Sequence, residues 1–225
     1  KNKINMVLET FSEDMIELLS VFRELRIDLL RSYFRYYHVI KTLEIIDRMG
    51  PMGRSGLSKI LNIGEGSSRN LIKKMKSIGL LEIDPVAGAI ITDRGRRILN
   101  IWRNNVSSAC VESKDLVNWR YLSINRISED FRRSLLRNKS IIDLRDELIK
   151  RGCLGGLFAE NLSGRVMLLN VRGEPDYDIT DTETGKRIRD FCEGFCIVSG
   201  SDNNCLKAEE CVWDLLIEIL LREYV

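Results

Sequence analysis

Apolar residues recur with a strict period over the first thirty residues. Successive members of the series lie alternately four and three positions apart, from Ile4 to Leu29. A 3.5-residue repeat sustained over several heptads predicts one helix over residues 1–32 with an apolar seam. We expect this seam to join two chains. The predicted dimer contacts are Leu8, Phe11, Met15, Leu18, Phe22 and Leu25. Further apolar positions widen the stripe, so the alternative is an amphipathic helix that packs on its own chain.

Shorter periodic segments separated by glycines fill residues 33–104. Apolar spacing predicts a helix that ends at Gly50-Pro51, and then a short helix capped by Ser55. A turn over residues 62–66 leads to a third helix, capped by Ser67. Helix, short helix, turn and helix in this order are typical of a helix-turn-helix.

A hairpin and a further helix complete this segment. Two short apolar strands, 81–83 and 89–91, flank the turn-forming residues 84–88, and Thr92 caps a helix that runs through Trp102. The sequence therefore predicts a winged helix-turn-helix over 33–104. The hairpin tip contains Asp84 and no Lys or Arg, so we do not expect it to enter a minor groove deeply.

The third helix separates apolar positions from hydrogen-bond donors. Arginine suits the guanine edge and asparagine the adenine edge, and lysines along a helix flank meet phosphates. The first turn carries Arg69 and Asn70, and lysines follow. Arginines just after the hairpin are further candidates for phosphate contact. The predicted DNA-binding residues are Arg54, Ser67, Arg69, Asn70, Lys73, Lys74, Lys76, Arg94, Arg96 and Arg97.

Charge is distributed unevenly along the chain. Residues 31–103 hold 14 Lys/Arg and 6 Asp/Glu, a net charge of +8, whereas residues 104–225 hold 17 and 21, a net charge of −4. A basic segment joined to a weakly acidic one is typical of a DNA-binding module attached to a sensor. A solvated basic helix also occurs in protein-binding modules, so a protein–protein interaction scaffold is the alternative function.

Residues 105–225 alternate strands and helices. The pattern predicts strands at 107–112, 119–127 and 195–199, a hairpin over 154–171, and a polar loop at 176–184. Helices are expected over 140–151, 185–192 and 207–224. Strands with helices on one side indicate an α+β layer. The predicted fold class is therefore α+β multidomain: a long N-terminal helix, a winged helix-turn-helix, and a C-terminal α+β sheet-and-helix domain.

Several stretches resemble an archaeal family of winged-helix transcriptional regulators whose C-terminal domain has no assigned function and is described as a ligand sensor. The resemblance covers roughly 38–222 and rests on residues 53–69, 91–95, 142–152 and 195–202, with Ser68 where an apolar residue is more usual. It implies a DNA-binding regulator that responds to a small-molecule effector.

Two places in the C-terminal segment are candidates for effector binding. Amides and small residues at a strand-to-helix turn can hold an anion, and an arginine beside an aspartate can contact a polar ligand. The predicted effector-binding residues are Arg145, Asp146, Gly200, Ser201, Asp202 and Glu209. A plain turn and a surface ion pair are the alternatives.

Cysteine and histidine usage argues against catalysis. All six cysteines lie beyond residue 109, the one histidine is His38, and no Cys/His spacing matches a zinc site. We expect six reduced, buried thiols, no metal, no cofactor and no enzymatic activity. A metal- or redox-responsive regulator that uses Cys192 and Cys196 is a further alternative.

Apolar runs are too short to span a bilayer, and the first residues lack a signal core. We therefore expect a cytoplasmic protein with no membrane partner. The sequence predicts a dimeric regulator that binds double-stranded DNA.

Overall fold

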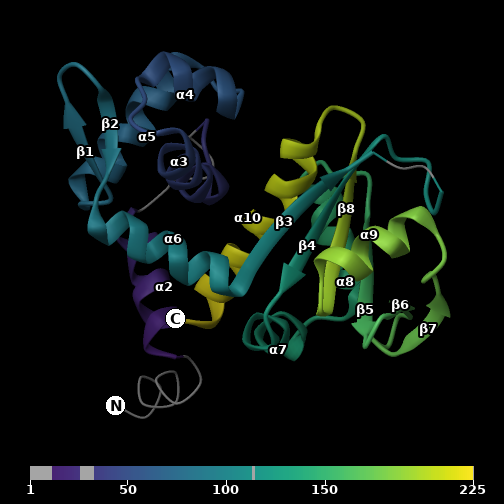
Figure 1. The fold of residues 1–225 in the computed structure, drawn as a ribbon. Helices are drawn as coiled ribbons and strands as arrows, with labels where there is room; N and C mark the ends of the chain where they lie inside the picture. Colours follow the sequence, from purple (N-terminus) through teal and green to yellow (C-terminus); the bar gives the residue numbers. More distant parts are fainter. Residues whose placement is uncertain (1–11, 26–32, 113–114, 225) are drawn as a thin grey trace, which may run out of the picture. The chain divides into compact units, whose positions relative to one another are not determined.

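The structure is a computed structural model that describes residues 12–25, 33–112 and 115–224. It divides into two compact units: Lys1–Arg103 with Tyr224–Val225 (unit 1) and Asn104–Glu223 (unit 2). Both contain helices and strands, so the protein is mixed α/β (Figure 1). No helix within the described ranges is long and apolar enough to cross a bilayer.

Unit 1 consists of helices and one hairpin. Its described elements are α2 (Glu13–Leu25), α3 (Tyr36–Met49), α4 (Arg54–Leu61), α5 (Glu65–Ser77), β1 (Leu81–Asp84), β2 (Gly88–Ile91) and α6 (Asp93–Asn105). The strands β1 and β2 pair antiparallel, which confirms the predicted hairpin.

Two predicted helix caps are wrong. The N-caps of α4 and α5 are Gly53 and Gly64, both with extended backbone, so Ser55 and Ser67 lie inside the helices. Glycine is an accepted N-cap residue and lets each helix begin before the serine that the sequence favours.

The apolar stripe of α2 is buried by the chain itself. Met15, Leu18, Phe22 and Leu25 are between 0% and 3% exposed. The ring of Phe22 meets that of Tyr36 edge to face, with centroids 5.3 Å apart. Side chains that are already covered leave no area for a second chain. The prediction that these four residues join two chains is therefore wrong, and α2 is instead an amphipathic helix that packs on its own chain. Leu8 and Phe11 lie outside the described residues.

Unit 2 is a six-stranded sheet with helices on both faces. Its strands are β3 (Val106–Val111), β4 (Tyr121–Ile127), β5 (Gly156–Leu162), β6 (Arg165–Leu169), β7 (Pro175–Asp178) and β8 (Gly194–Ser201). Its helices are α7 (Glu129–Arg137), α8 (Ile141–Lys150), α9 (Glu183–Phe191) and α10 (Cys205–Glu223). The strand order is β3-β4-β8-β5-β6-β7, and all neighbours are antiparallel.

Alternate residues of the central strands form two packing layers. Ile124 and Val198 belong to a core cluster with Ile188, just before the end of α9. On the other face, Ser199 donates through Oγ to the carbonyl of Ala208 in α10 at 2.7 Å. The prediction of helices on one side is therefore wrong.

The strand β7 lies in the predicted polar loop 176–184. Its residues are all exposed, and backbone pairing with β6 places them in the sheet. The expectation of a loop is wrong here because a short, fully exposed segment with a proline and two aspartates gives no signal of a strand.

Two disulfides join α10 to the rest of unit 2. Cys110 of β3 pairs with Cys205, and Cys153 before β5 pairs with Cys211. The expectation of six reduced thiols is therefore wrong for these four. The partners are 95 and 58 residues apart, so each bond closes a long loop and restricts the unfolded chain.

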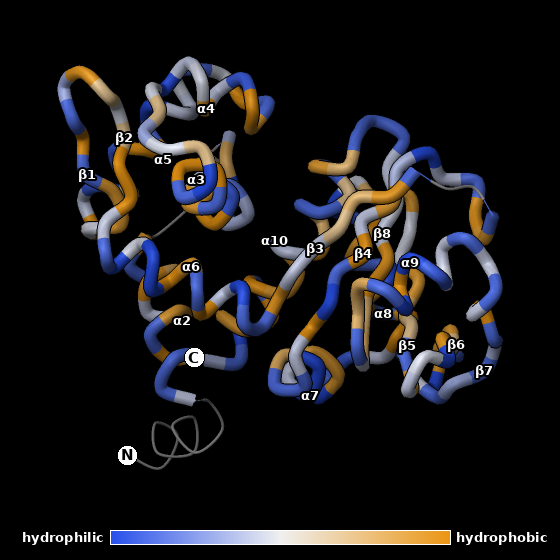
Figure 2. The backbone as a smooth tube through the Cα atoms, viewed as in Figure 1, coloured by the Kyte–Doolittle hydropathy of each residue, from blue (hydrophilic) through white to orange (hydrophobic). Residues whose placement is uncertain are grey.

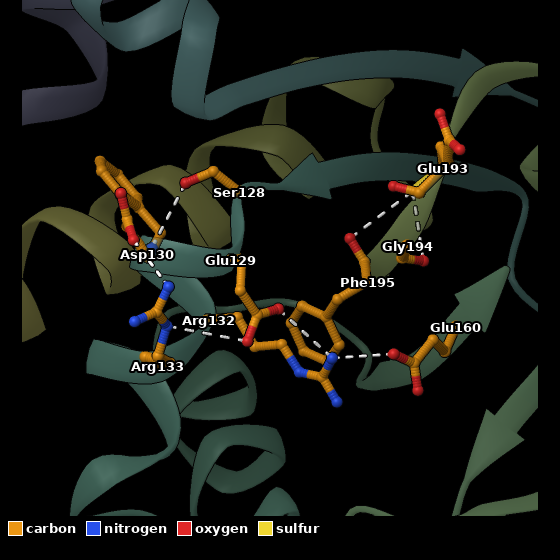
Figure 3. A network of polar contacts seen from close by, with 11 residues as sticks. Ser128, Glu129, Asp130, Arg132, Arg133, Glu160, Glu193, Gly194 and Phe195 are labelled. Atoms are coloured by element: carbon orange, nitrogen blue, oxygen red, sulfur yellow. Dashed lines mark hydrogen bonds and ion pairs between the residues drawn. The ribbon is translucent and has the colours of Figure 1, made fainter. Parts of the chain in front are cut away.

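A mostly covered arginine holds α7 on the sheet (Figure 3). The Arg132 guanidinium donates to Glu160 of β5 at 2.8 Å and lies 5.1 Å from the ring centre of Phe195 in β8. The side chains of Arg132 and Glu160 are 22% and 15% exposed. Solvent screens such a pair less than a surface pair, so it stabilises the α7 face of the sheet.

A second charged cluster gives unit 2 a pH dependence. Hydrogen bonds from Arg151 and then Lys150 lower the pKa of Glu147 to about 2. Arg151 also donates to Glu218 of α10 at 2.5 Å. The folded-state pKa lies below the unfolded value, so this stabilisation is complete above about pH 4.5 and is lost as the pH falls towards 2.

We predict that Glu147→Gln lowers the free energy of unfolding at pH 7 by about 1 kcal/mol, and that the difference from wild type shrinks towards pH 2. Urea unfolding at a series of pH values measures it. Glu193→Gln, at an exposed carboxylate, is the matched control and should follow wild type. If Glu147→Gln lowers the free energy of unfolding equally at pH 2 and pH 7, the pH dependence does not arise from Glu147.

Candidate nucleic-acid interface

The turn between α4 and α5 is three residues long. Asn62 adopts the left-handed conformation (φ 54°), which ends α4, and its amide bonds to the carbonyl of Ser58. The Ser58 hydroxyl donates to the carbonyl of Ile63 at 2.6 Å. Asparagine tolerates this backbone region better than most residues. The turn therefore sets the direction in which α5 leaves α4.

A buried hydroxyl joins the two helices directly. Ser68 is fully buried, and its Oγ donates to the carbonyl of Arg54 in the first turn of α4 at 2.9 Å. An apolar residue at this position could fill the space but not make this bond. Ser68 is thus a packed, hydrogen-bonded contact between α4 and α5.

The outward face of α5 carries donors without intramolecular partners. Arg69, Asn70, Lys73 and Lys76 are exposed, and within the described residues none of their side chains has a hydrogen bond or ion pair. Residues 69, 73 and 76 follow the i, i+4, i+7 spacing of one helix stripe. Opposite them, Leu71 and Met75 are buried in unit 1.

A hollow of about 350 Å³ runs beside this face. It is lined by α5 and by the segment that precedes α3: Tyr33, Phe34, Ser67, Asn70, Lys73, Lys74 and Ser77. The ring of Tyr33 is 87% exposed. The sequence did not single out Tyr33, because it precedes the helical pattern and follows no periodicity. Lys59 is exposed on α4, and the sequence did not single it out as a DNA contact either.

Lys74 also lines this hollow but has an acceptor within unit 1. Its Nζ donates to the carbonyl of Leu25 at the end of α2, 3.0 Å away. The prediction of Lys74 as a DNA contact stays a prediction, and a phosphate would share its ammonium with the Leu25 carbonyl.

The three predicted arginines of α6 also form ion pairs. Arg94 pairs with Glu24 at 2.9 Å and donates to the carbonyl of Ile78. Arg96 pairs with Asp47 at 2.8 Å. Arg97 pairs with Glu17 at 2.7 Å. The prediction that these arginines contact phosphates stays a prediction, and each phosphate would compete with a carboxylate of α2 or α3.

The hairpin tip is held by hydrogen bonds to Asp84 and exposes Val86. Asp84 accepts hydrogen bonds from the amides of Ala87 and Val86, which lower the pKa of its carboxyl group. Val86 is 97% exposed at this tip, which is coloured as hydrophobic in Figure 2. The tip therefore offers no cation to a phosphate.

The structure does not bring the predicted effector residues together. Arg145 and Asp146 are exposed on α8, 3.7 Å apart, whereas Gly200 and Ser201 are buried in β8. The ring of Trp119 covers Gly200, so a side chain at that position would overlap it. The cap of α10 is Asn204, whose Oδ1 accepts from the amide of Lys207 at 2.8 Å.

The remaining predicted effector residues do not form a ligand cradle either. Asp202 is exposed and Glu209 is buried in α10. Arg145 lines a hollow of about 230 Å³ between α8, β5 and β6, and none of the other five residues does. Of the two predicted places, the strand-to-helix turn is filled by Trp119 and by its own cap, and the Arg145–Asp146 pair is exposed on α8.

Cys192 and Cys196 are buried free thiols. A hydrogen bond with Cys192, followed by burial, raises the pKa of the Cys196 thiol. A raised pKa disfavours the reactive thiolate. Across the described part of the chain, no group of three His, Cys, Asp or Glu side chains is placed to hold a metal ion.

Comparisons with known proteins define the fold class and go no further. No protein-family model matches the chain, and no curated protein matches it. The structure is similar to that of the hypothetical protein PH0730 from Pyrococcus horikoshii OT3, with a TM-score of 0.57 and 18% identity, covering 83% of this chain and 91% of that one. At this identity the similarity is one of fold.

We predict that Ser68→Ala lowers the free energy of unfolding by about 1 kcal/mol, because the Arg54 carbonyl loses its buried donor. Urea unfolding measures the change. Ser67→Ala is the matched control one residue earlier: its half-buried hydroxyl has no partner within the described residues, and its stability should equal that of wild type. Equal urea midpoints of unfolding for Ser68→Ala and Ser67→Ala would contradict a stabilising role for the hydrogen bond of Ser68.

Proposed function

We propose that this chain is a DNA-binding transcriptional regulator, in which residues 33–104 form a winged helix-turn-helix with α5 in the DNA major groove. The observation that carries the proposal is the outward face of α5, where two lysines, an arginine and an asparagine have no partner among the residues that the structure describes. A recognition helix needs one buried stripe and one stripe of donors, and α5 has both.

Each side chain of the proposed interface has a role that follows from its chemistry. Arg69 and Asn70 lie in the first half of α5, where they would meet the edges of guanine and adenine. Lys73 and Lys76 lie further along the helix and would bind phosphates. Arg54, at the first position of α4, and Ser67 flank this stripe and would add phosphate contacts. Arg94, Arg96, Arg97 and Lys74 are left out because they have partners within unit 1.

Unit 2 is proposed to regulate this binding. We propose that it senses an effector or joins two chains, in line with the resemblance to archaeal regulators. A dimer would present two α5 helices to half-sites about one helical turn or a multiple of it apart.

We predict that Arg69→Ala/Lys73→Ala weakens binding to promoter fragments at least tenfold, because a base contact and a phosphate contact are lost together. Fluorescence anisotropy against salt concentration measures it. The slope of log K against log salt should become shallower by about 1 to 2, according to whether Arg69 also touches a phosphate.

The matched control is Arg172→Ala/Lys186→Ala, which removes two exposed cations from unit 2. It should bind DNA as wild type does. Equal affinities for the two double variants would contradict the proposed interface. Binding of wild type to DNA that does not weaken with salt would favour the protein-interaction scaffold.

A further inference from the structure

The two edges of the sheet in unit 2 differ in how they are protected. At one edge, β7 is four residues long, begins with Pro175 and carries Asp176 and Asp178. A bulge also shifts its register against β6. Short length, proline, charge and bulges are the features that keep an edge strand from pairing with another chain.

The other edge has none of these features. The strand β3 is six residues long, and its sequence, Val106–Val111, contains no proline and no charged residue. Its six residues pair with β4 in unbroken register. Among the described residues, no hydrogen bond joins the outer edge of β3 to another segment of unit 2. An unprotected edge of this kind is a template for a further strand.

Small side chains and adjacent space make β3 accessible to such a strand. Ser107, Ser108 and Ala109 form its middle and are half-buried. A hollow of about 390 Å³ lies beside its second half, lined by Ala109 and Val111 together with residues of α9. The side chains of β3 itself are therefore small, while Arg126 and Trp213 lie beside Ser107 and Ser108, and Arg187 and Asp190 of α9 line the hollow.

The charges at the two ends of β3 favour a second, antiparallel copy of the same strand. The guanidinium of Arg126 lies beside its start, donating to Ser107 Oγ at 3.1 Å and to the carbonyl of Asn104 at 3.3 Å. Glu112 follows its end and is exposed. Antiparallel self-pairing places each positive end beside a negative one, whereas parallel pairing would place like charges together.

We propose that two copies of this chain associate through β3, antiparallel to each other, about a two-fold axis near Ser108 and Ala109. The two six-stranded sheets then form one continuous sheet. This contact is isologous and closes as a dimer. It rests on the sheet of unit 2 and does not depend on DNA binding.

Sedimentation of the full chain tests the proposal, over about 1 to 100 μM protein. The sedimentation mass of wild type should reach twice the 25.9 kDa of one chain. Ala109→Lys places two ammonium groups near the axis and should raise the dimer dissociation constant at least tenfold. Tyr177→Lys, at an exposed position on the β7 edge, is the matched control and should dimerise as wild type does.

A charge-swap experiment separates loss of the contact from loss of the fold. Ala109→Lys and Ala109→Glu should each be mostly monomeric, and mixing them should restore a dimer. A wild type that stays at 25.9 kDa throughout, an Ala109→Lys variant that dimerises normally, or a mixture that stays monomeric would each overturn the proposal. Arg69→Ala/Lys73→Ala should dimerise fully, so failure of DNA binding and failure of this interface are distinguishable.

Discussion

Ion pairing within unit 1 determines which of its cations remain available to a partner. Carboxylates of α2 and α3 neutralise the three arginines at the start of α6, and the end of α2 accepts a hydrogen bond from Lys74. The cations on the outward stripe of α5 have no such partners within the described residues. The apolar side of α2 thus fills the core of unit 1. Its polar side pairs with cations of α6 and its end with Lys74, which restricts the proposed interface to the remaining cations of α5.

The sequence predicted the elements of unit 1 well because their signals are local. Apolar spacing located α3, α4 and α5, and turn-forming residues located the β1–β2 hairpin. Charge counting located the basic segment but could not separate Arg69 from Arg94, since the partner of Arg94 is Glu24, 70 positions away. The heptad of α2 gave no indication of what covers it, because a seam between chains and a seam within one chain follow the same period.

Unit 2 was harder to predict because its determinants are distant in sequence. The mixed α/β class was confirmed, yet the strand order, the second helical face and both disulfides depend on contacts between remote segments. The predicted effector turn failed for the same reason. Nothing near Gly200 in the sequence indicates that the ring of Trp119 covers it. The contrast between the β3 and β7 edges also becomes visible only once the strand order is known.

Photo-crosslinking tests the central claim most directly, since it asks which helix of unit 1 faces DNA. A benzoylphenylalanine placed at position 70 of α5 or at position 97 of α6 reports contact from each helix separately. The account predicts crosslinks to promoter DNA from position 70 and background levels from position 97, each lost when unlabelled promoter DNA competes. Crosslinks from position 97 with none from position 70 would contradict it.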